Sequence, residues 1–368
     1  MLALLVLSGV VAFIVSGVLI RWAWRHAQGY DIDKPQRFHV GDVPRLGGVA
    51  ILTGMLLGWL LGAVSTKMRG VIGVQLPAGT GAFWGVLVVP AVLAGIYEDL
   101  TQRLSVFYRL LLTASTAVLA CWLLDLSVLR LALPGIDPLI ASFPWLGMLF
   151  AVFAICGLPH AFNIIDGYNG LAGTVAIIIG LALAYVALQL GDRQLAAIVL
   201  CMVGATVGFL WWNYPRGLIF AGDGGAYLWG VVIAVGSVSL VQRHSQVSPW
   251  FPMLLLIYPV WETAFSIYRK LVRGVSPGVA DALHFHQLIY RRIVRGVFDD
   301  DAERHMLMRN NRTSPYLWGF TLLTVVPAVL FWYSTPILMI CCLLFIVLYV
   351  SAYLMLVRFK VPSWIQRR

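Results

Sequence analysis

Charged side chains are scarce in this sequence. Lysine, arginine, aspartate and glutamate make up 11% of the 368 residues, and hydrophobic residues make up 60%. A soluble globular protein carries roughly 25% charged residues. The composition therefore excludes an ordinary soluble protein and predicts an all-α, polytopic integral membrane protein. The length leaves no room for a separate soluble domain, so residues 1–368 are predicted to form a single membrane-embedded domain.

Cysteine is also sparse, and its positions exclude two kinds of site. The five cysteines, Cys121, Cys156, Cys201, Cys341 and Cys342, all lie in apolar runs. None has the spacing of a zinc site or of a secreted disulfide framework. We expect them to be buried as small hydrophobic side chains.

The first twenty residues contain no charge, and Arg21 and Arg25 follow them. A cleavable signal peptide has its basic residues before the apolar stretch. The order found here predicts an uncleaved first span with its N-terminus outside. The chain also has no internal repeat and no low-complexity linker.

Long apolar runs are abundant, and a spanning helix needs about 20 such residues. Eleven spans are predicted. They cover roughly 2–22, 46–66, 81–98, 104–124, 144–161, 170–190, 194–212, 221–241, 249–268, 315–334 and 336–358. Pro90, Pro259 and Pro327 lie inside these runs, where kinks are expected.

The distribution of lysine and arginine predicts the topology. One set of loops, with the C-terminal tail, holds 21 of these residues and the opposite set holds 5. Basic residues accumulate on the cytoplasmic side, which places the first set in the cytoplasm. The C-terminus is then inside. Residues 269–314 form the largest cytoplasmic loop. No soluble basic module is present to bind nucleic acid.

Five polar breaks interrupt the apolar chain. The length between consecutive breaks is close to that of two membrane crossings. Four contain the acidic residues Asp33, Glu98-Asp99, Asp166 and Asp223, and the fifth is the basic segment 269–314. All five can lie at one membrane face. A membrane protein could gather a metal and phosphate site in this way.

The adjacent carboxylates Glu98 and Asp99 repel each other at a predicted helix end. A divalent cation or a proton would relieve the repulsion. Mg²⁺ favours such oxygen ligands and often binds substrate phosphates as well. A solvated pair at a helix end is the alternative.

Two glycine-rich segments carry the other acids. In Asn163–Leu171, Asn163 and Asp166 share one face of a helical turn, and glycines allow close backbone approach. In Gly222–Gly225, glycines surround Asp223, as suits a loop that meets a phosphate or a metal. Each segment could instead be a plain turn with a helix cap.

The basic loop offers several hydrogen-bond donors to a diphosphate, from His284, His286, Arg291 and Arg292. A zinc pair would need a third ligand, and none has suitable spacing. An ordinary cytoplasmic loop remains the alternative.

Two further polar groups have open interpretations. Arg37 and His39 in the first loop could meet a lipid phosphate or simply anchor the interface. Glu262 lies within a predicted span, where a carboxylate is a functional candidate. Alternatively, it lies near the inner interface or pairs with an arginine such as Arg269.

Taken together, these segments resemble the polyprenyl-phosphate N-acetylhexosamine-1-phosphate transferases, the WecA-like and MraY-like membrane enzymes of glycosyltransferase type 4. The resemblance covers nearly the whole chain, because five motifs follow in the family's order on alternate loops. The matching residues are Asp33, Pro35, Arg37, His39, Pro44, Gly47 and Gly48, then Glu98-Asp99, then Asn163–Leu171, then Gly222–Gly225 with Asn213 upstream, and finally Ser276-Pro277, Asp281, His284–His286 and Arg291-Arg292.

Three residues depart from the family pattern. Glu98 replaces the first tandem aspartate, Asn169 replaces the second aspartate of the Asp-Gly-x-Asp-Gly motif, and Phe38 replaces a basic residue. The triple histidine of the MraY-like branch is absent. The resemblance therefore favours the branch that initiates O-antigen or other surface polysaccharides.

The resemblance implies the transfer of an N-acetylhexosamine 1-phosphate from a UDP-sugar to undecaprenyl phosphate, with release of UMP. It places the site at the cytoplasmic face of a bacterial inner membrane, with Mg²⁺ or Mn²⁺ as cofactor, and a homo-oligomer is left open. Four acids are the implied catalytic residues: Glu98, Asp99, Asp166 and Asp223. The implied metal ligands are Asp223 and Asp99, the latter alternatively a base toward the lipid phosphate. The implied substrate-binding residues are Asn163, Asn169, Asn213, His284, His286, Arg291, Arg292, Arg37 and His39.

Two other functions remain open at this point. A secondary transporter could use intramembrane carboxylates for ion coupling, although such proteins usually show an internal repeat. A non-catalytic family member would explain Glu98 and Asn169. Release of UMP from a UDP-sugar separates the enzyme from both.

Overall fold

The computed structural model describes residues 1–27, 42–67, 76–276, 278, 281, 283–294 and 301–358. The regular elements in these ranges are all helices. They are α1 (Leu2–Ala27), α2 (Gly47–Lys67), α3 (Ala78–Thr101), α4 (Val106–Leu124), α5 (Ile136–Ser142), α6 (Pro144–Ile165), α7 (Leu171–Gln189), α8 (Arg193–Asn213), α9 (Gly222–Arg243), α10 (Trp250–Leu255), α11 (Ile257–Val272), α12 (Phe285–Arg292), α13 (Ala302–Leu330) and α14 (Thr335–Val357).

The predicted all-α, multi-pass membrane architecture is confirmed. Within the described residues, ten helices are long and apolar enough to cross a membrane. The ninth predicted span, 249–268, is instead divided into α10 and α11 at Leu256. Pro259 explains the break, because proline lacks an N–H and its ring clashes with the carbonyl four residues earlier, which is that of Leu255. Pro90 and Pro327 lie inside unbroken helices.

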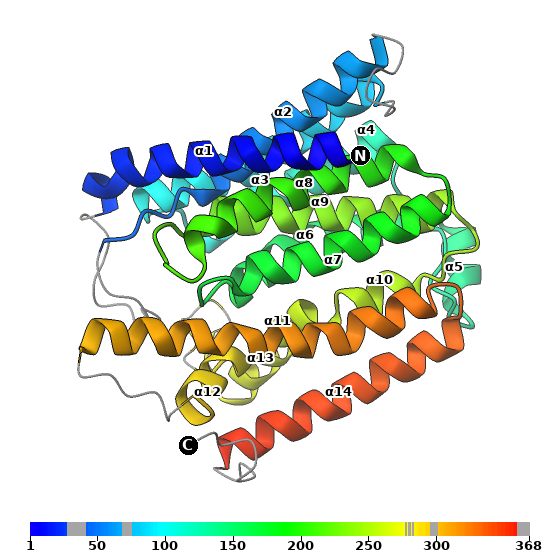
Figure 1. Ribbon diagram of the computed structural model, residues 1–368. Coiled ribbons are helices and arrows are strands. Elements are labelled where there is room, and N and C mark those ends of the chain that lie inside the picture. Colours follow the sequence, from blue (N-terminus) through cyan, green and yellow to red (C-terminus); the bar gives the residue numbers. More distant parts are fainter. Residues whose placement is uncertain are drawn as a thin grey trace.

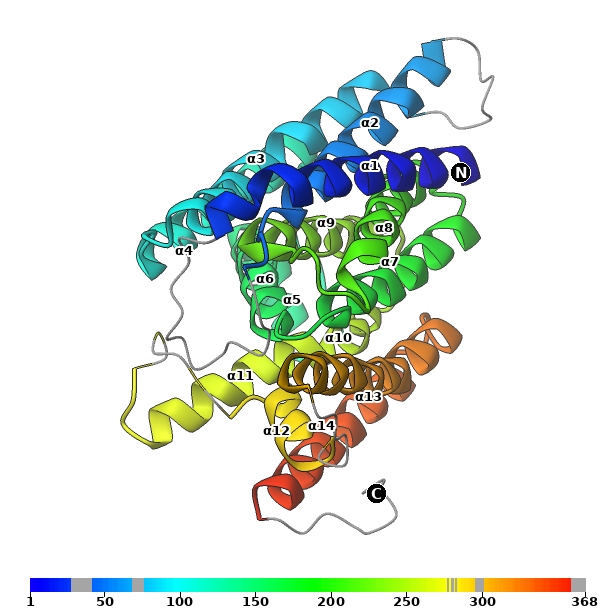
Figure 2. The ribbon, with the colours of Figure 1, turned by 60° about the vertical axis from the view of Figure 1, so that its left-hand side comes forward.

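The long helices run alongside one another in a bundle, with the short α5 at one end (Figure 1). The start of α1 and the end of α14 lie at opposite ends of this bundle. Turned by 60°, the structure shows α10 to α14 on one side and α1 to α4 on the other, with α6 to α9 between them (Figure 2). The side of the membrane on which each terminus lies remains a prediction.

Helix α9 occupies the centre of the bundle, and most of its side chains are buried. Trp229 is completely enclosed and donates from Nε1 to the hydroxyl of Thr206 in α8, at 2.8 Å. An apolar helix can be enclosed by other helices or by lipid, and neighbouring helices enclose α9. The first turn of α9 carries Asp223, so the core of the bundle fixes the position of this carboxylate.

Helix α3 approaches the start of α9 backbone to backbone, at Gly95. A methyl group on Gly95 would lie 2.6 Å from the carbonyl carbon of Asp223. We expect Gly95→Ala to destabilise the fold by about 1–3 kcal/mol, as overpacking usually does, measured by thermal unfolding in detergent. Gly85→Ala on the same helix is the control, because its methyl would lie 3.8 Å from Leu56. Equal unfolding temperatures for the two variants would contradict this close approach.

Candidate active site

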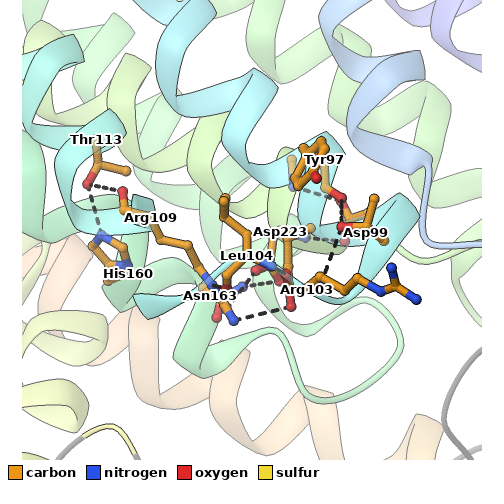
Figure 3. A network of polar contacts seen from close by, with 12 residues as sticks. Tyr97, Asp99, Arg103, Leu104, Arg109, Thr113, His160, Asn163 and Asp223 are labelled. Carbon is orange, nitrogen blue, oxygen red and sulfur yellow. Dashed lines mark hydrogen bonds and ion pairs between the residues drawn. The ribbon is translucent and has the colours of Figure 1, made fainter. Parts of the chain in front are cut away.

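The carboxylate of Asp99 holds the start of α9. It lies in the last turn of α3 and is only 4% exposed. Its Oδ1 accepts a hydrogen bond from the backbone N–H of Asp223 at 2.8 Å, and its Oδ2 accepts one from Gly224 at 2.9 Å (Figure 3). A carboxylate at a helix N-terminus satisfies free N–H groups and complements the helix dipole. Two of the predicted catalytic acids are therefore joined by a single hydrogen bond.

The side chain of Asp223 brings a third motif to the same place. Its Oδ1 accepts from the amide nitrogen of Asn163 at 2.7 Å, and its Oδ2 lies 3.3 Å from Nη1 of Arg109. The carboxylate keeps 20% of its surface exposed. The segments around Glu98-Asp99, Asn163 and Asp223, which are far apart in sequence, thus meet at one end of the bundle.

Arg109 is a residue of this site that the sequence reasoning missed. It lies in the first turn of α4 and bridges Asp223 and Glu98, with 3.2 Å between Nη2 and the Glu98 carboxylate. Glu98 also accepts from the backbone N–H of Leu104 at 2.7 Å. The cation that relieves repulsion around Glu98 is therefore an arginine in this structure. The position of Arg109 inside an apolar run could have identified it from the sequence, because an arginine there needs polar or charged partners.

Polar contacts continue from Arg109 into the bundle. The hydroxyl of Thr113, one turn along α4, bonds to the carbonyl of Arg109 and lies 3.0 Å from Nε2 of His160 in α6 (Figure 3). These contacts join α4 to α6 beside the site. Neither Thr113 nor His160 was singled out from the sequence.

Asp166 follows the end of α6, close enough to Asp223 for their charges to interact. Burial and the negative charge of Asp223 raise the pKa of Asp166 to about 7, and Arg45 opposes this shift. Asp166 is therefore partly protonated at neutral pH, and a nearby cation would favour its charged form.

Asn169 is buried and fastened to α13. Its backbone N–H donates to the side-chain amide oxygen of Asn310 at 2.8 Å. Its side-chain nitrogen donates to the side-chain amide oxygen of Asn311 at 3.0 Å. Its carbonyl accepts from the hydroxyl of Ser314 at 2.6 Å. These α13 residues were not identified from the sequence. The predicted contact between Asn169 and a nucleotide stays a prediction.

Asn213 fastens the same turn to the end of α8. Its side-chain oxygen accepts from the N–H of Gly170 at 2.7 Å, and its nitrogen donates to the carbonyl of Ile219 at 2.8 Å. Gly170 has a φ of +71°, a conformation that favours glycine. Asn213 therefore connects the loop before α7 with the loop before α9, and its contact with substrate stays a prediction.

The two histidines of the predicted His-x-His motif lie at the start of α12 with their rings stacked, 5.3 Å apart. His286 faces the Asp166 turn, because a methyl group on Gly167 would lie 2.9 Å from its Nε2. Burial and the charge of His284 lower the pKa of His286 to about 3, so His286 is neutral at physiological pH. The fifth motif therefore reaches the segment that carries Asp166.

The expectation that Glu262 could pair with Arg269 is wrong. Arg269 instead bonds to Asp281 at 2.9 Å, and the Glu262 carboxylate lies 3.0 Å from Nδ1 of His284. His284 is 22 residues away in the sequence but adjacent to Glu262 in the fold, so the sequence alone did not identify this contact.

The remaining predicted residues have different positions. Arg291 and Arg292 lie half-buried in the last turn of α12. Arg37 and His39, together with Asp33, lie outside the described residues. In the part of the chain that the structure describes, no group of three or more histidine, cysteine, aspartate or glutamate side chains is arranged to hold a metal.

Comparison with known proteins gives the same assignment as the motifs. Residues 82–241 match the family described as glycosyl transferase family 4. Over 260 residues the chain is 28% identical to a probable undecaprenyl-phosphate N-acetylglucosaminyl 1-phosphate transferase of Bacillus subtilis, covering 69% of this chain and 68% of the relative. It is 26% identical over 288 residues to an undecaprenyl-phosphate alpha-N-acetylglucosaminyl 1-phosphate transferase of Thermotoga maritima, covering 78% and 81%. A phospho-N-acetylmuramoyl-pentapeptide-transferase of Bartonella quintana is 28% identical over 271 residues, covering 66% and 72%.

Proposed function

Because this chain belongs to the WecA-like and MraY-like family of polyprenyl-phosphate sugar-1-phosphate transferases, we propose that it transfers an N-acetylhexosamine 1-phosphate from a UDP-sugar to undecaprenyl phosphate. A phosphate oxygen of the lipid forms a bond to the β-phosphorus of the UDP-sugar. The bond from that phosphorus to the bridging oxygen breaks, and UMP leaves. The product is an undecaprenyl-diphosphate sugar at the cytoplasmic face of a bacterial inner membrane.

The convergence of three motifs on Asp223 is the observation that supports this proposal. The Asp223 carboxylate is partly exposed. The backbone N–H of Asp223 donates to Asp99, and its carboxylate contacts Asn163 and Arg109. Phosphoryl transfer depends mainly on positioning and on neutralising charge. A site at the end of the bundle can receive a soluble nucleotide and a lipid phosphate together.

The acids around Asp223 fit a magnesium ion. Mg²⁺ usually binds one or two carboxylates, retains several waters and completes its shell with substrate phosphates. Asp223 offers an accessible carboxylate, with Asp166 as its acidic neighbour, and a site of this kind needs no third protein ligand. When bound, Mg²⁺ would neutralise charge on the diphosphate oxygens. Mn²⁺ prefers similar oxygen ligands.

Asp99 fits this metal role less well than Asp223, because both of its oxygens accept backbone N–H groups. Its predicted contact with metal or with lipid phosphate remains a prediction. We assign Asp99 to positioning α9. Arg109 lies where its guanidinium could exchange a carboxylate for a phosphate oxygen, since arginine binds both groups with the same geometry.

The pair of histidines supports a surface polysaccharide, such as O-antigen, as the destination of the product. Phosphates of the donor or the lipid would be bound by His284, His286, Arg291 and Arg292. Asn163 would keep the Asp223 side chain in position. Arg37 and His39 would meet the lipid phosphate.

The proposal is tested with purified protein in detergent, undecaprenyl phosphate and a panel of UDP-N-acetylsugars. We expect labelled sugar phosphate to appear in lipid, with one UMP released per transfer, and EDTA to abolish both. Asp192→Asn serves as the control, because this acid lies at the start of α8, at the other end of the helix from Asn213. If no UDP-sugar yields UMP, the proposal fails, and ion-coupled uptake in proteoliposomes would then support a transporter.

A further inference from the structure

A buried carboxylate joins three helices beside the His-x-His motif. Glu262 in α11 is completely enclosed. Its Oε1 accepts from Nδ1 of His284 at 3.0 Å and from the backbone N–H of Phe285 at 3.1 Å. Its Oε2 accepts from the hydroxyl of Tyr349 in α14 at 2.7 Å. A buried carboxylate is costly unless it is hydrogen-bonded, and three donors satisfy this one.

These contacts fix the orientation of the His284 ring. A carboxylate only accepts hydrogen bonds, so Nδ1 of His284 must carry the proton in this contact. Nε2 is then the ring nitrogen left for another group, and it donates to a phosphate oxygen when the ring carries both protons. The stacked ring of His286 limits rotation about the side chain of His284. Glu262 thus sets both the ring plane and the nitrogen that His284 presents.

A second set of contacts holds the chain just before His284. Arg269 in α11 donates to the carboxylate of Asp281 and to the hydroxyl of Tyr353, at 2.9 and 2.7 Å. Asp281 accepts from the N–H of Leu283 at 3.0 Å, and Tyr353 donates to the carbonyl of Leu283 at 3.3 Å. Tyr349 and Tyr353 are one turn apart on α14, so this last helix supports the motif at two points.

We propose that Glu262 and Tyr349 are positioning residues that act through His284 and hold its Nε2 toward a substrate phosphate. This inference rests on the proposed function, in which His284 binds phosphate. Other charged or titratable groups near His284 are His286 on α12 and Asp281 on the preceding segment. The hydrogen bond between its Oε1 and Nδ1 of His284 makes Glu262 the group that orients this ring.

The first test compares two tyrosines near Glu262. Tyr349→Phe removes the hydrogen bond to Glu262 and keeps the ring. Tyr258→Phe is the matched control, because its hydroxyl is equally buried and has no hydrogen-bond partner among the described residues. We expect kcat/KM for transfer to fall about 3- to 10-fold in Tyr349→Phe and to stay at the wild-type value in Tyr258→Phe. Glu262→Gln, which keeps the shape and loses the charge, should cost about 10- to 100-fold.

The second test is a double-mutant cycle with His284→Gln. If Glu262 and Tyr349 act through His284, each substitution should change kcat/KM less than about twofold once His284 is replaced. Nitrogen NMR of the histidine rings reads the contact without turnover, and the His284 Nδ1 signal should move in Glu262→Gln and not in Tyr258→Phe.

The outcomes separate this inference from the proposed function. Suppose that the wild-type protein transfers sugar phosphate. If Glu262→Gln and Tyr349→Phe then lower kcat/KM as much in the His284→Gln background as in the wild type, the positioning role alone is overturned. An unmoved Nδ1 signal, or equal losses in Tyr349→Phe and Tyr258→Phe, overturns it too. A wild-type protein that transfers nothing refutes the proposed function and removes the basis of the inference.

Discussion

Replacing Asp99 by asparagine is expected to reduce transfer at least 100-fold and to lower stability as well. Asparagine has one acceptor oxygen, whereas Asp99 accepts from two backbone N–H groups at the start of α9. An amide nitrogen would then face a buried N–H, and an unsatisfied donor of this kind costs about 1–3 kcal/mol. The first turn of α9, with Asp223, would shift. Sugar-phosphate transfer and thermal unfolding in detergent measure the two effects.

Asp223→Asn is the matched control for this prediction. It should also lose transfer, because the accessible carboxylate is removed. Its unfolding temperature should stay close to that of the wild type, since the ion pair with Arg109 is partly exposed and such pairs contribute about 0–1 kcal/mol. If Asp99→Asn retained wild-type stability while Asp223→Asn lost it, the assignment of Asp99 as the support of α9 and Asp223 as the accessible, metal-binding carboxylate would be overturned.

The sequence predicted most of the spans and the meeting of the segments around Glu98-Asp99, Asn163 and Asp223, because both depend on local chain properties. Apolar run length determines which segments cross a membrane, and spacing by two crossings returns each polar break to the same end. Asp223 therefore lies beside Asp99 and Asn163, as this spacing requires. The division at Leu256 was missed because Pro259 was read as a kink, although its effect falls on the hydrogen bond that would have joined α10 to α11.

The partners within the site could not be predicted, because they depend on which helix faces which. Arg109 was counted only for topology, yet it lies between Glu98 and Asp223. Arg269 was one of the partners considered for Glu262, which instead contacts His284. Asn310, Asn311 and the α14 tyrosines belong to no motif. Side chains that hold a loop in place can come from any neighbouring helix, so only the packed structure reveals them.

The departure at Asn169 has a physical explanation in these contacts. The family pattern has an aspartate there, but in this chain the side-chain nitrogen of Asn169 donates to the oxygen of Asn311. The nitrogen of Asn311 in turn donates to the carbonyl of Pro215 at 2.6 Å. The two amides form a directed chain that an aspartate cannot begin, because an ionised carboxylate has no donor. Asn169 is therefore suited to its own neighbours in α13.

Asn169→Asp, which restores the residue of the family pattern, is accordingly expected to impair this protein. An oxygen would face the oxygen of Asn311, and turning the Asn311 amide would break its bond to Pro215. We expect a loss of about 1–3 kcal/mol in stability, since a buried polar contact is left unmade, and a fall in transfer of about tenfold or more. Thermal unfolding and the transfer assay on the same preparation measure both.

Asn311→Ala provides the control that identifies the cause. Once the opposing oxygen is gone, the Asn169→Asp substitution should cost little further stability, so the two changes should be strongly non-additive. Additive losses would show that the new charge acts elsewhere, for example on Asp166 three residues earlier. Higher transfer in Asn169→Asp than in the wild type would mean that the lost charge, and not the contact with α13, governs this position.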